Sequence, residues 1–119
     1  VCQSVFVATD STKAVLDANN AKKIRFISSV GADADNLSEL DASLLEDRMI
    51  IVDSHHSMML GDLKAWEEQN RLDRKNVIEL STLVENQNTL TQNVLFVSTG
   101  IATQDALISQ FIYDKLTKS

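Results

Sequence analysis

The 119-residue chain contains no proline, three glycines and one cysteine. An average chain of this length carries about six prolines, so the turns of this one depend on other residues. The single Cys2 excludes a disulfide within the chain, and we expect it to be inert because no histidine or other base is near it in sequence. This cysteine usage is typical of a reducing compartment, and we expect a cytoplasmic protein.

The sequence also has no apolar run as long as a membrane span, and no charged and then apolar leader of a signal peptide. Its formal net charge of −6 and its isoelectric point near 4.7 disfavour nucleic acids and anionic membranes as partners. A hydrophobic content of 44% with 24% charged residues is ordinary for a globular domain, and the length predicts a single domain over residues 1–119.

Two phosphate-binding motifs are missing. The sequence has neither G-x-G-x-x-G nor a P-loop, so it lacks the usual cradle for a pyrophosphate. The chain begins at Val1 rather than at methionine, which favours a processed protein or a fragment.

The clearest feature that is present is an apolar run from Ile24 to Val30, which ends at Gly31 and is followed by Asp33. Three other short apolar runs end in the same way, in small hydroxyl, acidic or glycine residues: Ser4–Ala8, Met49–Val52 and Val94–Val97. Runs of this kind, separated by segments long enough for helices, predict an α/β fold in three layers, with a parallel sheet of about four strands between helices.

The segments between the runs are predicted as helices and loops. We expect a short helical turn at 11–16, a helix capped by Asp41 and running to Arg48, a helix from Ser54, a short helix at 78–84, a loop at 85–92 and a final helix at 101–116. Met59, Leu63 and Trp66 form an apolar stripe on the third of these, which Gly61 weakens by about 1 kcal/mol relative to alanine. The final helix has its own apolar face: Ile101, Ile108, Phe111, Ile112 and Leu116.

The carboxyl ends of parallel strands lie on one edge of a sheet, where α/β proteins bind ligands. The polar residues that follow the four runs are therefore predicted to gather there: Thr9, Ser11, Asp33, Asp53, Ser98, Thr99 and Gly100.

Two of these positions have alternative interpretations. Asp33 is either a general acid and base beside a bound ligand or the cap of a turn or of the next helix. The segment Ser98–Gly100 precedes a helix, so it either binds an anion or a polar amide, or it is an ordinary N-cap.

The adjacent His55 and His56 diverge by about 100° on a helix and have no cysteine partner nearby, so we expect no metal site.

Taken in order, several motifs resemble those of the ornithine cyclodeaminase and mu-crystallin family. They are Phe6-Val7-Ala8-Thr9-Asp10-Ser11, Val30-Gly31-Ala32-Asp33, Glu39-Leu40-Asp41, Ile51-Val52-Asp53-Ser54, Gly61-Asp62-Leu63, Glu79-Leu80, and the run from Leu95 to Asp105. The resemblance covers essentially the whole chain. It implies the second half of a Rossmann-type dinucleotide-binding domain plus a C-terminal helix. The glycine-rich loop and the domain with basic substrate-binding residues and the dimer interface would lie before Val1.

The resemblance implies NAD- or NADP-dependent chemistry at the α-carbon of an amino acid. The activities implied are conversion of ornithine to proline and ammonia, or related amino acid dehydrogenase or ketimine reductase reactions. Asp33 matches the family's acid and base residue. The positions implied to line the cofactor are Ala8, Thr9, Ser11, Val30, Gly31, Ser98, Thr99 and Gly100.

The sequence departs from the family at two turns. Where the family has Pro-Gly-Lys after Gly-Ala-Asp and one small residue, this chain has Asp35-Asn36-Leu37, and Asp10 replaces a proline after Thr9. Loss of that lysine removes a cation beside Asp33.

Three further expectations follow. A sheet truncated at one edge predicts self-association, through that edge or through exposed apolar helix faces, and thus a homo-oligomer. The chain alone is expected to be inactive. The alternative functions are a receiver-like signalling module, since Asp10, Asp33 and Asp53 all follow predicted strands, and a non-catalytic crystallin-like binding protein.

Overall fold

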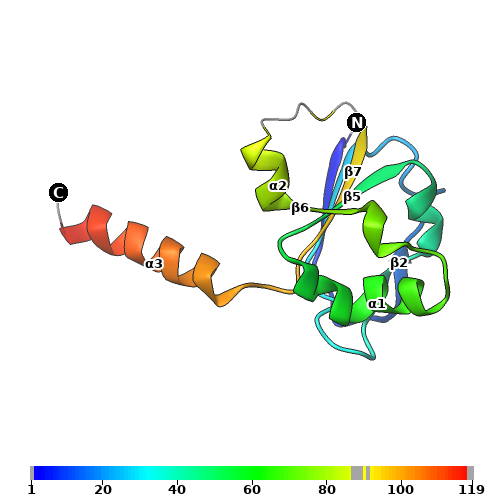
Figure 1. The fold of residues 1–119 in the computed structure, drawn as a ribbon, viewed down its shortest axis with the longest axis horizontal. Helices are drawn as coiled ribbons and strands as arrows, with labels where there is room; N and C mark the ends of the chain where they lie inside the picture. Colours follow the sequence, from blue (N-terminus) through cyan, green and yellow to red (C-terminus); the bar gives the residue numbers. More distant parts are fainter. Residues whose placement is uncertain (1, 87–89, 91, 118–119) are drawn as a thin grey trace.

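The computed structural model describes residues 2–86, 90 and 92–117. Its main sheet has five parallel strands in the order β1-β3-β7-β5-β6, with β1 and β6 at its two edges (Figure 1). The strands are β1 (Ser4–Val7), β3 (Phe26–Ser29), β7 (Asn93–Val97), β5 (Arg48–Val52) and β6 (Val77–Glu79). A second sheet pairs β2 (Thr12–Leu16) in parallel with β4 (Ser38–Leu40).

Helical segments connect the strands. They are the 3-10 helices η1 (Ala42–Glu46), η2 (His55–Met59) and η3 (Arg74–Asn76), and the α-helices α1 (Gly61–Glu68), α2 (Leu80–Glu85) and α3 (Ala102–Thr117). Asp41 caps η1, as predicted, by accepting a hydrogen bond from Ser43 N at 2.9 Å.

One face of the main sheet carries most of the core. Side chains alternate between the faces along each strand, so Ile27, Ile50 and Leu95 all lie on the same side. Leu44 from η1, together with Leu63 and Trp66 from α1 and Met58 from η2, packs against this face. The opposite face has a smaller cluster of Ile51, Val94 and Leu83, with Leu83 contributed by α2. Helical segments therefore cover both faces, which makes this a Rossmann-type α/β fold in three layers.

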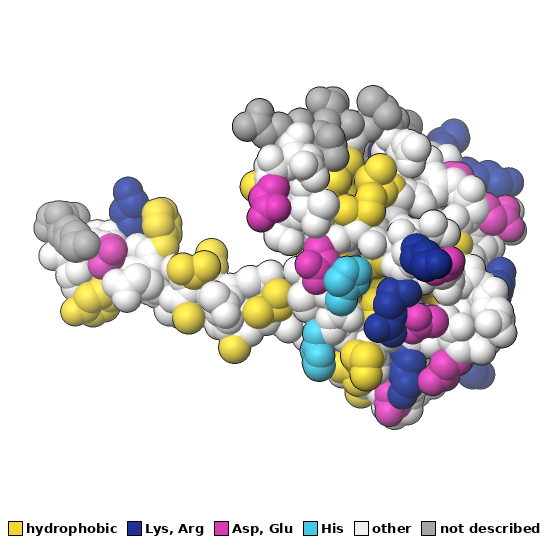
Figure 2. All heavy atoms as spheres, in the orientation of Figure 1, with side chains coloured by type: hydrophobic (Ala, Val, Ile, Leu, Met, Phe, Trp, Pro, Cys, Tyr) yellow, Lys and Arg dark blue, Asp and Glu magenta, His cyan; other side chains and the backbone are white. Residues whose placement is uncertain are grey.

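The long helix α3 stands apart from this globule (Figure 1). It extends away beyond the end of β7, and no residue within its bounds is buried. Its apolar side chains face solvent, with Ile108 and Phe111 both 61% exposed and Leu116 75% exposed. Figure 2 shows hydrophobic side chains along the projecting helix. Four residues of the predicted apolar face are thus exposed on α3, namely Ile108, Phe111, Ile112 and Leu116. The fifth, Ile101, precedes the helix and is half-buried.

Several sequence-based expectations are wrong in detail. Residues 12–16 form β2 rather than a helical turn, because this exposed segment pairs with β4. The main sheet has five strands rather than about four, because Val77–Glu79 pairs with β5 as β6 before the short helix begins. The helix predicted from Asp41 to Arg48 is shorter than expected. It is a 3-10 helix that ends at Glu46, and Arg48 is already the first residue of β5.

The predicted stripe of Met59, Leu63 and Trp66 also fails at one position. Gly61 has φ of +56°, which ends η2 and starts α1 in a new direction, so Met59 is 54% exposed while Leu63 and Trp66 are buried. Part of the loop predicted at 85–92 lies outside the described residues. Cys2 is exposed, and none of the helices that the structure describes is long and apolar enough to cross a membrane.

Candidate functional site

The strand register brings four chain segments to one edge of the main sheet. Val7 pairs with Ser29, Ser29 with Val97, and Val97 with Val52, so the residues after these strands emerge side by side. Backbone hydrogen bonds extend the pairing into the loops: Val30 N donates to Val7 O at 3.0 Å, and Ser98 N to Ser29 O at 3.0 Å. The sequence prediction of a common rim at the carboxyl edge is confirmed.

Asp33 lies on a tight turn at this rim. Its backbone N–H donates to Gly31 O at 3.0 Å, and its side chain is exposed. Within the part of the chain that the structure describes, the Asp33 carboxylate accepts no hydrogen bond, and no helix follows the turn. The structure therefore does not use this carboxylate as a cap, and the side chain faces solvent at the rim.

A second acidic residue, Glu39 on β4, lies beneath this turn and is completely buried. Its carboxylate accepts hydrogen bonds from Thr9 N, from Ser29 Oγ at 2.6 Å and from Gly31 N at 3.0 Å. Burial opposes ionisation, but the hydrogen bonds from Ser29, Thr9 and Gly31 outweigh it and lower the pKa of Glu39. Glu39 is thus a buried anion that joins the loop after β1 to the turn after β3.

Close backbone packing explains why position 31 is glycine. A Cβ at Gly31 would collide with the backbone of Thr9, lying 2.6 Å from Thr9 N, and also with the carboxylate of Glu39. The next residue, Ala32, is buried against the start of α1, where a Cβ at Gly61 would lie 2.9 Å from Ala32 Cβ. Contacts on both sides thus fix the backbone that leads into Asp33.

Asp62, in the first turn of α1, holds β4 in place. It is 4% exposed and accepts hydrogen bonds from Ser38 Oγ at 2.7 Å, Glu39 N at 2.9 Å and Leu40 N at 3.1 Å. Burial raises the pKa of Asp62, and these hydrogen bonds only partly oppose that effect. Asp62 therefore supports the strand that carries Glu39.

Asp53, which the sequence placed among the rim residues, is at the rim, but both of its carboxylate oxygens are engaged. Oδ1 accepts from Ser54 N at 2.8 Å and from Ser57 Oγ at 2.6 Å, and Oδ2 accepts from Ser98 Oγ. This carboxylate connects the end of β5 to the end of β7.

The segment Ser98–Gly100 is held by the same cluster. Ser57 Oγ lies 3.2 Å from Thr99 Oγ1 and accepts from Thr99 N at 3.3 Å, while Gly100 N donates to Ser98 Oγ at 3.1 Å. Gly100 has φ of +86°, and a Cβ there would meet nothing within 4 Å. The Gly100 N–H is therefore used for a hydrogen bond to Ser98 within its own turn, while the space beside the Gly100 Cα is open.

The loop after β1 completes the rim. Ala8 and Thr9 are exposed, as is Val30 opposite them, and Ser11 is half-buried. Ser11 Oγ donates to Lys13 O at 2.6 Å, so its hydroxyl belongs to the local turn. Every residue predicted from the resemblance to line a cofactor thus lies in a loop that follows β1, β3 or β7.

The loop after Asp33 has an ion pair. Lys64 Nζ on α1 lies 2.7 Å from Asp35 Oδ1, and this hydrogen bond raises the pKa of Lys64. Position 37, where the family has a lysine, is a half-buried leucine in this chain. The cation beside this loop is instead Lys64 of α1, and it pairs with Asp35. Among the described residues, no three histidine, cysteine, aspartate or glutamate side chains form a group that could hold a metal ion, and His55 and His56 are exposed.

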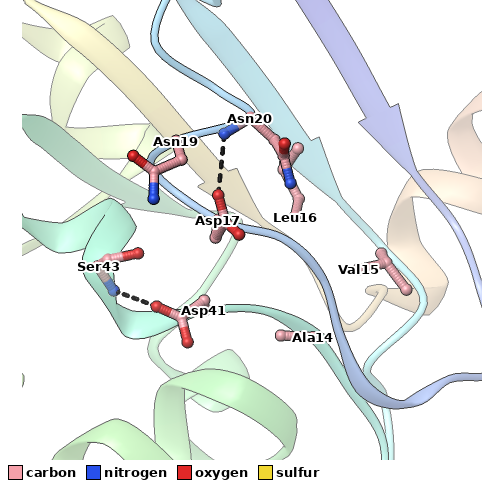
Figure 3. Close-up of a pocket in the computed structure, with 8 residues that line it drawn as sticks. All are labelled: Ala14, Val15, Leu16, Asp17, Asn19, Asn20, Asp41 and Ser43. Atoms are coloured by element: carbon pink, nitrogen blue, oxygen red, sulfur yellow. Dashed lines mark hydrogen bonds between the residues drawn. The ribbon is translucent and has the colours of Figure 1, made fainter.

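A hollow of about 460 Å³ beside β2 lies apart from the rim (Figure 3). None of the predicted site residues lines it. The two acidic residues on its wall are already used: Asp17 accepts from Asn20 N at 2.9 Å, and Asp41 caps η1 (Figure 3). This hollow therefore has the features of ordinary turn and cap structure.

Sequence reasoning identified the rim but missed the residues beneath it: Ser29, Glu39, Ser57 and Asp62. Both acidic residues were visible as parts of short motifs, Glu39-Leu40-Asp41 and Gly61-Asp62-Leu63. Their partners lie up to 30 positions away along the chain, so only the fold shows what they bind.

Solved structures with a similar fold include the following three. The Δ1-pyrroline-2-carboxylate reductase of Thermococcus litoralis, solved with NADH and L-proline, has a TM-score of 0.80 and 24% identity over 97% of this chain and 38% of that chain. The iminosuccinate reductase of Paracoccus denitrificans, solved with NAD⁺, has a TM-score of 0.79 and 22% identity over 97% of this chain and 37% of that chain. An archaeal alanine dehydrogenase dimer with bound NAD has a TM-score of 0.75 and 21% identity over 94% of this chain and 37% of that chain.

The chain therefore spans less than two-fifths of the length of these structures. A search of curated protein sequences found no match. The model of the ornithine cyclodeaminase/mu-crystallin family, in contrast, matches residues 2–119. With the motifs in the expected order, a Rossmann-type sheet and a rim at its carboxyl edge, the chain belongs to the ornithine cyclodeaminase/mu-crystallin family.

Proposed function

We propose that this chain is part of an NAD- or NADP-dependent oxidoreductase that acts on an amino acid or a cyclic imine. The observation that carries the proposal is the exposed Asp33 carboxylate, which has no partner among the described residues. It lies on the same rim as the loops after β1 and β7. The family assignment and the three similar folds, all solved with NAD or NADH, support this class of reaction.

The rim residues fit the nicotinamide end of a dinucleotide. The side chain of Ala8 is small and the space beside Gly100 is open, so backbone and ligand can approach closely at these two positions. The residues proposed to line the cofactor are Ala8, Thr9, Ser11, Val30, Gly31, Ser98, Thr99 and Gly100. The pyrophosphate end has no glycine-rich cradle in this sequence.

The nicotinamide, when bound, accepts a hydride from the α-carbon of the substrate or returns one to it. Asp33 moves the accompanying proton. Its carboxylate takes a proton from the ammonium nitrogen of the amino acid, which frees the lone pair that forms the C=N bond as the hydride leaves. In the reverse direction, protonated Asp33 returns that proton to the nitrogen. An exposed carboxylate at the rim is accessible to a substrate in either direction.

We further propose that the chain is one part of a longer protein and is inactive alone. It covers 37–38% of the three similar chains, and its sequence has neither a pyrophosphate cradle nor basic residues among the predicted rim positions. In isothermal titration calorimetry, we expect the 119-residue chain to bind NAD only at millimolar concentration or not at all. Micromolar binding would contradict this part of the proposal.

The acid and base role is tested by Asp33→Asn in the full-length protein that contains this chain. General acid and base catalysis contributes about 10²- to 10⁴-fold, so we expect kcat to fall by a factor in that range while the Kd of NAD changes little. The assay follows NADH by its absorbance with amino acids as substrates, and the reverse reaction with cyclic imines.

Asp10→Asn is the matched control, because Asp10 is also an exposed aspartate beside the rim. It should leave kcat within about twofold, since the proposed proton transfer between carboxylate and substrate nitrogen does not use Asp10. Equal losses in both variants would contradict the assignment of Asp33. A wild-type protein that binds NAD but turns over no amino acid or imine would instead favour the crystallin-like binding function.

The receiver-like alternative finds no support in the site. A receiver needs acidic residues free to hold Mg²⁺, but Asp53 uses both of its carboxylate oxygens on Ser54, Ser57 and Ser98.

A further inference from the structure

We propose that Glu39 is a positioning residue for the proposed reaction: its buried carboxylate fixes the loop after β1 and the turn that carries Asp33 relative to each other. The proposal rests on the proposed function. Nothing in the resemblance assigns Glu39 a role, and Glu39 does not itself reach the rim, because it is completely buried.

The first argument is the set of donors that surround the carboxylate. Thr9 N–H and Gly31 N–H belong to two different loops, and Ser29 Oγ belongs to the last residue of β3. A carboxylate accepts hydrogen bonds at both oxygens, so it satisfies all three donors at once. A neutral glutamine has one acceptor oxygen, and its amide nitrogen would face an N–H or O–H group instead.

The second argument is how little room the turn has. Gly31 packs so closely on Thr9 and Glu39 that a Cβ cannot be accommodated. Ala32 packs equally closely on Gly61, where a Cβ would collide with it. Asp33 follows immediately. A shift of the Glu39 carboxylate is therefore transmitted to the backbone of Thr9 on one side and of Asp33 on the other.

The third argument is that Glu39 is itself supported. Asp62 accepts hydrogen bonds from the backbone N–H groups of Glu39 and Leu40, at 2.9 and 3.1 Å. Asp62 belongs to the first turn of α1, which packs on the core through Leu63 and Trp66. The position of Glu39 is thus set by a rigid helix, as a positioning residue requires.

The test compares Glu39→Gln with wild type in the full-length protein, at a temperature where both are fully folded. We expect Glu39→Gln to raise the Kd of NAD and to lower kcat by about 10-fold or more each, because displacing a site by about 1 Å has effects of this size. Hydrogen exchange measured by mass spectrometry should accelerate in the peptides that cover residues 8–11 and 30–34.

Asp41→Ala is the control for a purely structural effect. It removes the cap of η1, two residues from Glu39, and should lower the urea midpoint of unfolding while kcat, Kd and exchange at the two peptides stay at wild-type values. Wild-type kinetics in Glu39→Gln, with or without altered exchange, would overturn the positioning role. The positioning role would also be overturned if Glu39→Gln and Asp41→Ala lowered kcat by the same factor and lowered stability by the same amount.

Two further results keep the outcomes separate. If Glu39→Gln does not fold, Ser29→Ala removes one of the three donors, and a two- to fivefold increase in the Kd of NAD is expected, roughly as for one lost hydrogen bond. A wild-type protein that neither binds NAD nor reacts refutes the proposed function. The exchange measurement then still decides whether Glu39 holds the two loops together, and unchanged exchange refutes that as well.

Discussion

Gly31 allows close packing beneath the turn that carries Asp33. It lies between the backbone of Thr9 and the carboxylate of Glu39, at a point where no side chain fits, and two residues later the chain presents Asp33. Gly100 differs: it needs glycine for its φ of +86° but has open space around it. The two glycines are therefore required for different physical reasons.

These reasons predict different losses of stability. Gly31→Ala should lower the free energy of unfolding by about 2–3 kcal/mol, because the backbone must move to relieve the collision. Gly100→Ala should lower it by about 1 kcal/mol, the strain of a left-handed backbone at an L residue. Urea unfolding of the two variants measures both values, and a larger loss at Gly100 would contradict the packing argument.

The rim residues could be predicted from the sequence because each follows an apolar run directly. The residues that hold the rim in place could not. Glu39 is separated from Thr9 by 30 positions, and its burial depends on a three-residue strand that has no apolar run of its own. Asp53 was correctly placed at the rim, but its engagement with Ser98 becomes visible only when β5 and β7 are adjacent.

At the scale of elements, the strands that were predicted are those with an apolar run. β5 and β7 are central strands, and their continuous apolar runs, Met49–Val52 and Val94–Val97, are typical of parallel strands covered on both faces. β2 and β4 pair only with each other, and neither has a run or an alternation that separates strand from helix. Tertiary pairing decided their structure, so local sequence could not.

Asp62 joins α1 to β4 through three hydrogen bonds, which makes a sharp prediction. Asp62→Ala leaves the backbone N–H groups of Glu39 and Leu40 without this buried acceptor, and each loss costs about 1–3 kcal/mol. We expect a total destabilisation of about 2–4 kcal/mol in urea unfolding, since the relief of burying a charge offsets part of the loss.

Asp73→Ala provides the comparison. Asp73 accepts from Lys75 N at 2.9 Å at the exposed start of η3, so its removal should cost only about 1 kcal/mol. If the two substitutions destabilise the chain equally, Asp62 does not have the supporting role described above.

At the scale of the whole molecule, two apolar surfaces are uncovered among the residues that the structure describes. One is the projecting helix α3. The other is an apolar hollow of about 250 Å³ on the less covered face of the sheet, lined by Phe26, Ile51, Leu80, Leu83, Leu90, Val94 and Phe96. Surfaces of this kind on an isolated chain favour association.

We therefore expect the 119-residue chain to self-associate, so that its sedimentation coefficient rises with concentration. Phe111→Glu should shift it towards the monomer, because Phe111 is 61% exposed on α3 and a charge there opposes burial of the helix. Gln104→Glu, which adds the same charge to an exposed polar position of α3, should leave association unchanged. A wild-type chain that remains a strict monomer at high concentration contradicts the prediction.

The isolation of α3 has one more consequence, for the secondary structure itself. Isolated helices shorter than about 12–15 residues are marginal in water even when they are rich in alanine. α3 is only slightly longer, with 16 residues of which none is buried, and it contains two alanines. We therefore expect the stability of α3 to increase when a partner surface buries its apolar side chains. The helical signal in circular dichroism should accordingly increase when the chain associates with that partner surface. The helicity of α3 therefore measures assembly without an activity assay.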